Sequence, residues 1–90
     1  INMIFGIQIR GARGLLKMSQ ADLAKETGLS LQTIVRLESD EEAVKKASLD
    51  TVMKIRNILG KKGIKFIAPK SNETLNGVGV RLYTEVDEVE

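Results

Sequence analysis

The segment from residue 20 to residue 39 has the most informative pattern in the chain. It reads Gln20-Ala21-Asp22-Leu23-Ala24-Lys25-Glu26-Thr27-Gly28-Leu29-Ser30-Leu31-Gln32-Thr33-Ile34-Val35-Arg36-Leu37-Glu38-Ser39. Gly28 has no Cβ and permits the left-handed turn that ends one short helix, and Ser30 then caps another. Ala24 is the small residue that two closely packed helices need. The segment therefore predicts a helix-turn-helix. Its predicted buried positions are Leu23, Leu29, Ile34 and Leu37.

Apolar residues at helical spacing predict one helix before this segment and one after it. Upstream, within residues 4–16, the apolar face consists of Phe5, Ile9, Ala12 and Leu16. Downstream, Ser48 caps a helix that runs to about Lys62 and stops at Gly63. The apolar face of this second helix consists of Leu49, Val52, Ile55 and Leu59.

Two further signals mark the ends of the short helices in residues 20–39. Ser19 and Asp22 have the spacing of a capping box, which begins the first of them. After the second, residues 39–47 are mostly charged and have no apolar period. We expect a loop there, with one helical turn as the alternative, and Val44 would pack this loop against the helix that follows.

After Gly63 the spacing of apolar residues changes from helical to alternating. Residues 64–67 and 78–83 alternate as strands do, and Asn76-Gly77 is a turn signal between them. The chain is thus predicted to be mostly α, with four to five helices and a C-terminal pair of antiparallel β-strands. The expected divisions are a helical domain over residues 3–63, a strand pair over 64–83 and an acidic, disordered tail over 84–90.

The composition excludes several classes of protein. Ninety residues give room for one domain, and with one Tyr, two Phe and no Trp its core must be aliphatic. Without Cys or His there are no disulfides, thiolate nucleophiles or ordinary zinc sites, so we expect no catalytic residue, no metal, no cofactor and no enzymatic activity. No apolar run is long enough to cross a bilayer and no leader is evident, so we expect a cytoplasmic protein. Ile1 and Asn2 precede Met3, where we expect translation to begin.

Charge is distributed unevenly along the chain. Residues 1–70 contain 13 Lys/Arg and 7 Asp/Glu, a net charge of +6. Residues 71–90 contain 1 Arg and 5 acidic residues, a net charge of −4. A basic body with an acidic tail suits nucleic-acid binding, and it equally fits an ordinary domain with a solubilising tail.

Over residues 4–62 the chain resembles the lambda-repressor and Cro-like family of helix-turn-helix regulators, often called the XRE family. The resemblance is carried by Ser-Gln-Ala-Asp-Leu-Ala from residue 19, Gly-Leu-Ser from residue 28 and Arg-Leu-Glu from residue 36. The later Gly-Ile-Lys-Phe-Ile and Gly-Val-Arg-Leu-Tyr are similar to a strand pair of short bacterial members. Lys17 and Ser39-Asp40 depart from the family, which often has Gly in those turns. The resemblance implies a lambda-repressor-like fold that binds double-stranded DNA.

In this family the second helix of the motif reads the major groove. On its solvent face Gln32 can pair with adenine and Arg36 with guanine, and Leu31 can pack on a thymine methyl group. The predicted base contacts are Leu31, Gln32, Thr33 and Arg36. The alternatives are an ordinary solvated face for Gln32 and Arg36, and a protein contact for Leu31.

Other polar residues of the motif would bind the DNA backbone. The predicted phosphate contacts are Ser19, Gln20, Ser30, Ser39, Lys45 and Lys46. Gln20 opens a helix whose N-terminus favours an anion. Lys45 and Lys46 fit a solvated loop equally well, and Lys61 and Lys62 suit the C-terminal end of a helix rather than DNA.

The resemblance also implies an ion pair between Arg13 and Glu38 that sets the angle of the reading helix, with Ala24 and Gly28 shaping the turn. One reading helix offers about three side chains, so we expect a homodimer on a two-fold symmetric site. The predicted interface lies in the strand pair, at Phe66, Ile67, Val80, Leu82 and Tyr83. The alternative is that the strands only cover the helical core.

These expectations favour a transcriptional repressor or autoregulator. The alternative is an antitoxin-like module that binds a partner protein such as a toxin through residues 64–90 and binds DNA secondarily. A hydrolase or nuclease would need a convergent acidic site or a His or Cys, and the run Asp40-Glu41-Glu42 is predicted to be solvated charge.

Overall fold

The computed structural model describes residues 4–68 and 77–83. Its elements in chain order are α1 (Gly6–Leu16), α2 (Gln20–Thr27), α3 (Leu31–Ser39), α4 (Glu41–Lys46), α5 (Leu49–Lys61), β1 (Ile64–Ile67) and β2 (Gly79–Leu82). Within these residues the fold is mostly helical, with five helices and one two-stranded antiparallel sheet, which confirms the predicted fold class. The start at Met3 and the tail over residues 84–90 lie outside the described residues.

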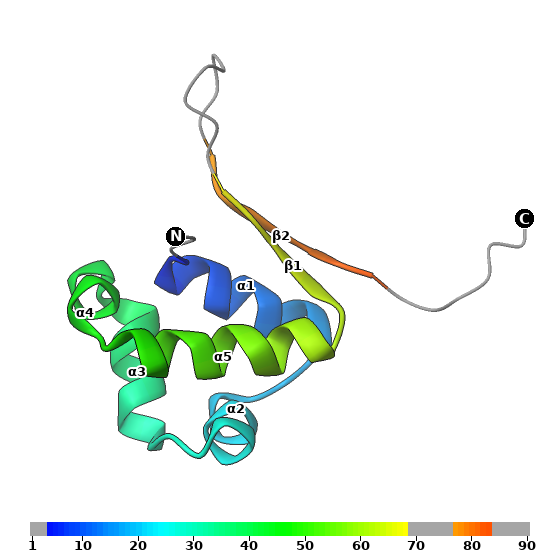
Figure 1. Cartoon of the computed structure of the whole chain (residues 1–90). Helices are drawn as coiled ribbons and strands as arrows, with labels where there is room; N and C mark the ends of the chain where they lie inside the picture. Colours follow the sequence, from blue (N-terminus) through cyan, green and yellow to red (C-terminus); the bar gives the residue numbers. More distant parts are fainter. Residues whose placement is uncertain (1–3, 69–76, 84–90) are drawn as a thin grey trace, which may run out of the picture.

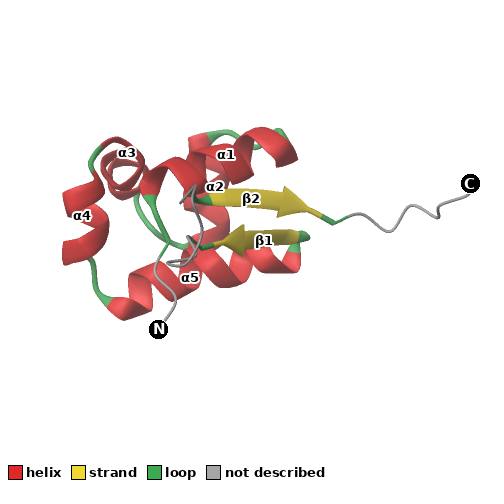
Figure 2. Cartoon of the chain, turned by 90° about the horizontal axis from the view of Figure 1, so that it is seen from above, coloured by secondary structure: helices red, strands yellow, loops and turns green. Residues whose placement is uncertain are grey.

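The helices form the body of the molecule, and the strand pair lies across the side that is farther from α2 (Figure 1). Seen from above, β2 runs alongside α1 and β1 runs over α5 (Figure 2). The strands pair from Ile64 opposite Leu82 to Ile67 opposite Gly79. The sheet therefore packs over α1 and α5 and leaves the outer side of α3 uncovered.

The core is aliphatic, as the composition requires. Its largest fully buried side chains are Ile4, Ile9, Leu23, Ile34, Ile55 and Leu59. Phe66, Val80 and Leu82 pack against this core from the sheet. Side chains alternate along a strand, so these residues share one face of the sheet with Ile64. The sheet thus closes the core.

Polar caps and left-handed turns separate the first three helices. Ser19 Oγ accepts from Asp22 N at 2.9 Å and Asp22 Oδ2 accepts from Ser19 N at 3.1 Å, which is the predicted capping box. The latter bond holds the pKa of Asp22 below its ordinary value. Gly28 ends α2 with φ 76°, and Lys17 ends α1 with φ 58°. A left-handed residue with a Cβ costs about 1 kcal/mol, so the Lys17 turn is strained where the family often has Gly.

Two local predictions are wrong. The loop expected over residues 39–47 is mainly helix α4, which Asp40 caps by accepting from Glu42 N at 2.9 Å. A helix of six residues is too short to show an apolar period, although the predicted burial of Val44 is correct. Leu49 is 61% exposed, because the first residue of α5 points away from the core.

The N-terminus of α1 passes very close to the end of α3. A Cβ on Gly6 would collide with the carbonyl oxygen of Leu37 and would lie 3.2 Å from the Cα of Glu38. This approach requires a residue without a side chain, so Gly6 determines how closely α1 and α3 can pack.

Candidate nucleic-acid interface

One side of α3 is presented to solvent. Leu31 and Val35 are 48% and 42% exposed although both are apolar, and Gln32 and Arg36 are exposed beside them. These four residues lie on one face of the helix, while Ile34 on the opposite face is fully buried. We call Leu31, Gln32, Val35 and Arg36 the outer row. It combines apolar surface with two side chains that can hydrogen-bond to base edges.

Two residues predicted to touch DNA form the N-terminal cap of α3. Ser30 Oγ accepts from Thr33 N at 3.1 Å, and the Ser30 and Thr33 hydroxyl oxygens lie 2.8 Å apart. Ser30 is exposed, whereas Thr33 is half-buried. The structure therefore places Thr33 beside the outer row rather than in it.

The carboxylate of Glu38 joins α1, α2 and α3. Arg13 Nε and Nη2 donate to Glu38 Oε2 and Oε1 at 2.6 and 2.8 Å, a bidentate pair, and Gln20 Nε2 donates to Oε1 at 3.2 Å. The Arg13 and Glu38 side chains are only 16% and 4% exposed. The hydrogen bond that Arg13 donates to Glu38 raises the pKa of Arg13 above its ordinary value. The ion pair implied by the resemblance is therefore formed, and it fixes α3 relative to the other two helices.

Besides Ser30, three more of the hydroxyl or amide side chains predicted to contact phosphate already have partners within the protein. The amide of Gln20 is bound to Glu38, Ser39 Oγ donates to Val35 O at 2.9 Å, and Ser19 Oγ caps α2. Ser19 serves the cap only as an acceptor, so its O–H can still donate to a phosphate. Gln20 keeps a second amide N–H, whereas Ser39 would have to rotate its hydroxyl.

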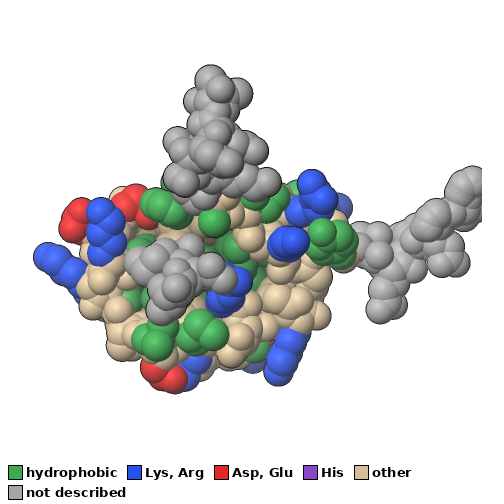
Figure 3. Space-filling view, turned by 45° about the horizontal axis from the view of Figure 1, so that its top comes forward, with side chains coloured by type: hydrophobic (Ala, Val, Ile, Leu, Met, Phe, Trp, Pro, Cys, Tyr) green, Lys and Arg blue, Asp and Glu red, His purple; other side chains and the backbone are tan. Residues whose placement is uncertain are grey.

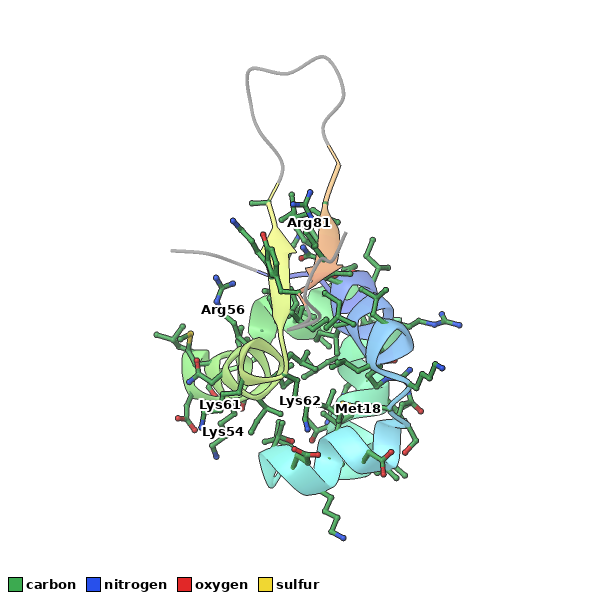
Figure 4. All side chains as sticks on the ribbon, turned by 90° about the vertical axis from the view of Figure 1, so that its right-hand side faces the viewer. Met18, Lys54, Arg56, Lys61, Lys62 and Arg81 are labelled. Carbon is green, nitrogen blue, oxygen red and sulfur yellow. The ribbon has the colours of Figure 1, made fainter. Side chains whose placement is uncertain are left out.

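The four lysines considered in the sequence fall into different environments. Lys45 lies 3.5 Å from Glu42 in an exposed pair within α4. Lys46 lines a hollow of about 330 Å³ between α3, α4 and α5, together with Arg36 of the outer row. Lys62 lies 3.2 Å from Glu26 and so links α5 to α2, and Lys61 is exposed on α5 (Figure 4). Of these four lysines, Lys46 is therefore the one that shares a hollow with residues of α3.

The sequence analysis missed the role of Gln8. This side chain is 3% exposed, and its Nε2 donates to Ile67 O at 3.0 Å and to Gly79 O at 2.8 Å. Its Oε1 accepts from Phe5 N at 2.8 Å. A polar residue between two apolar ones was the only local signal, because its partners in the sheet lie far along the chain.

Glu41 is a second residue whose role has no local signal. Its carboxylate oxygens accept from Gly6 N at 2.9 Å and from Ile7 N at 3.2 Å. Glu41 therefore caps the N-terminus of α1 from a separate helix, and it is not part of a solvated acidic run.

The surface seen from the sheet side has Lys and Arg side chains spread over it, with few carboxylates (Figure 3). Among residues 4–68 and 77–83, no group of three or more acidic residues could hold a metal ion. In the same part of the chain, no helix has the length and hydrophobicity of a membrane span.

Two short helices joined at a left-handed glycine, the second held by a buried ion pair with its outer row exposed, define a helix-turn-helix DNA-binding domain. The chain belongs to the lambda-repressor and Cro-like, or XRE, family: a family model described as helix-turn-helix matches residues 9–66. The match identifies the protein as a DNA-binding regulator. No curated protein matches the chain.

Proposed function

We propose that the protein is a sequence-specific repressor or autoregulator of transcription and that α3 reads the DNA major groove. The observation that supports this most is the outer row: two half-exposed apolar side chains beside Gln32 and Arg36, on a helix that Glu38 locks in place. Apolar side chains exposed together on a well-packed helix are typical of a contact surface. Repression requires only that the protein occupy a DNA site, and we propose that it does so in the cytoplasm.

The outer row supplies the chemistry of base recognition. Gln32 offers a donor and an acceptor to adenine, Arg36 offers two donors to guanine, and Leu31 meets a thymine methyl group. Each good bidentate pair contributes about 1–3 kcal/mol of discrimination. Thr33, at the inner edge of the row, would contribute a contact from the start of the helix.

Residues around the outer row would position the protein on the DNA backbone. The proposed phosphate contacts are Ser19, Gln20, Ser30, Ser39, Lys45 and Lys46. Contacts of this kind set the register and orientation of a reading helix, and they carry no sequence information directly.

We also propose that the protein acts as a homodimer. The outer row of one copy can specify only a few base pairs, whereas specific binding generally needs about 4–10 kcal/mol over non-specific DNA. The two-stranded sheet has unpaired edges, which favour pairing with a second copy. Of the predicted interface residues, Ile67 and Tyr83 lie outside the core cluster, so they are the ones available for that contact.

Selection of bound DNA from a random pool tests the proposal. We expect an enriched sequence with two symmetric half-sites whose centres are about 34 Å apart, one turn of DNA. Failure to enrich any sequence would contradict sequence-specific binding.

The first testable change is Arg36→Ala. It should weaken binding to the enriched site by about tenfold to a hundredfold, and binding to random DNA much less. Titration of labelled duplexes measures both affinities. Lys61→Ala is the control for loss of one positive charge, since Lys61 is exposed on α5, outside the outer row and the sheet (Figure 4). Equal loss on both kinds of DNA would show that Arg36 touches phosphate only.

A further inference from the structure

A polar hollow of about 340 Å³ lies where α1, α2 and α3 meet. It is lined by Arg10, Arg13, Gln20, Val35, Glu38 and Ser39. Val35 belongs to the outer row, so the hollow opens at the edge of the surface that would face DNA. It is distinct from the base-reading positions and includes an arginine to which the sequence assigned no role.

The charged side chains of this hollow differ in whether they have partners within the protein. Glu38 is neutralised by the bidentate pair with Arg13 and receives a third hydrogen bond from Gln20. Arg10 is exposed, and in the described part of the chain it forms no ion pair. The hollow therefore has one net positive charge, and Arg10 is its source.

The remaining hydrogen-bond donors favour an anion over a neutral ligand. The Arg10 guanidinium has five N–H groups in a fork that matches the oxygens of a phosphate. Gln20 uses one amide N–H for Glu38, and its second can donate to the same anion. A carboxylate-lined hollow would normally repel phosphate, but here Glu38 is only 4% exposed and is covered by its partners.

We propose that this hollow binds one phosphodiester of the DNA backbone, with Arg10 as the cation that holds it. The proposal rests on the reading of the major groove by α3, because a duplex placed along the outer row brings its backbone to the edge at Val35. Arg10 is then a positioning residue: it contacts phosphate, carries no sequence information and anchors α1 as well as α3 to the duplex.

The salt dependence of DNA binding tests this assignment. Arg10→Gln and Lys61→Gln each remove one positive charge from an exposed side chain, so they change the net charge of the protein equally, and Lys61 on α5 lies outside both the outer row and the proposed dimer surface. We expect Arg10→Gln to weaken binding to enriched and random DNA alike, by about tenfold in 0.1 M salt. The slope of log K against log salt should become shallower by about 0.9, the loss of one phosphate contact. Lys61→Gln should leave the slope unchanged, and equal slopes for the two variants would overturn the proposal.

A scan with methylphosphonate, which removes the charge of one phosphate at a time, identifies the partner. One methylphosphonate substitution should weaken DNA binding by the unaltered protein about tenfold. The same substitution should not weaken DNA binding by the Arg10→Gln variant any further. If no position shows this coupling, the hollow does not bind a phosphate.

Failure of the proposed function has a different outcome: no sequence is enriched, while the salt-dependence slopes on random DNA can still be compared. Thermal unfolding of both variants should match the unaltered protein because both side chains are exposed.

Discussion

The side chain of Glu38 shows how a single buried charge organises this interface. It is held by Arg13 from α1 and Gln20 from α2, so three helices depend on one carboxylate. Removing one partner of a buried pair leaves the other charge without compensation, which costs more than the intact pair contributes. The pair therefore acts mainly on the orientation of α3.

Arg13→Met tests the cost of an uncompensated Glu38. We expect a loss of about 3–5 kcal/mol in the free energy of unfolding, measured by urea denaturation. Lys54→Met is the matched control, since Lys54 and Asp50 form an exposed pair at 3.4 Å whose loss should change stability by less than about 0.5 kcal/mol. The double change Arg13→Met with Glu38→Leu should recover part of the loss. An effect of Arg13→Met as small as that of Lys54→Met would mean that water compensates Glu38.

At this scale the sequence predicted the helix caps and the one ion pair that the family pattern contains, and it missed most other side-chain contacts. Arg13 and Glu38 could be paired because the family pattern contains both positions. Gln8 and Glu41 could not, because the sheet partners of Gln8 lie 59 and 71 positions away, those of Glu41 lie 34 and 35 positions away, and no spacing rule joins them. Nor did local pattern show that Gln20 and Ser39 are hydrogen-bonded inside the protein.

Among the elements, α1 depends most on contacts with others. Its N-terminus is capped by Glu41 of α4, and its first residue lies against the backbone of α3. The sequence predicted α1 from its apolar face. That periodicity does not say how closely α1 packs against α3. The sequence favoured a loop where α4 forms and gave a helical turn only as the alternative, because the six residues begin at a cap that resembles a solvated acidic run.

Gly6→Ala tests the approach of α1 to α3. The added Cβ would collide with Leu37 O, a backbone atom that cannot rotate away, and overpacking of this kind costs about 1–3 kcal/mol. Thermal or urea unfolding measures the loss. Gly14→Ala is the matched control in the same helix: a Cβ there meets nothing within 4 Å, so the change should stabilise the protein by up to about 1 kcal/mol. Similar effects of the two changes would contradict the close approach.

In the whole molecule, the sheet and α3 lie on different sides of the helical body. The alternation of residues 64–67 predicted a strand correctly, but it could not tell which face would be buried by the protein itself. The structure packs Phe66, Val80 and Leu82 on the core, so a dimer would have to use the remaining surface of the sheet.

The proposed homodimer is tested by sedimentation at micromolar concentration without DNA. We expect the intact chain to sediment as a dimer and the double change Ile67→Lys with Tyr83→Lys to sediment as a monomer, because added charges oppose burial of the sheet. Leu49→Lys with Met53→Lys adds the same charge at two residues of α5 that are 61% and 38% exposed, and should leave the dimer intact. A monomeric intact chain would exclude a dimer that forms before DNA is bound.

The hydrogen bonds of Gln8 to the sheet also determine the order in which this protein folds. The bond to Gly79 O joins residues 71 positions apart, so closing it costs more chain entropy than a contact within the helix-turn-helix, by about 0.6 kcal/mol for each doubling of the separation. Contacts between nearby residues form first, and those between distant residues form late. We therefore expect the helices to collapse around Leu23 and Ile34 before the strands pair, with the side chain of Gln8 exposed until they do. On this expectation the sheet is the last part of the molecule to form and the first to detach on unfolding.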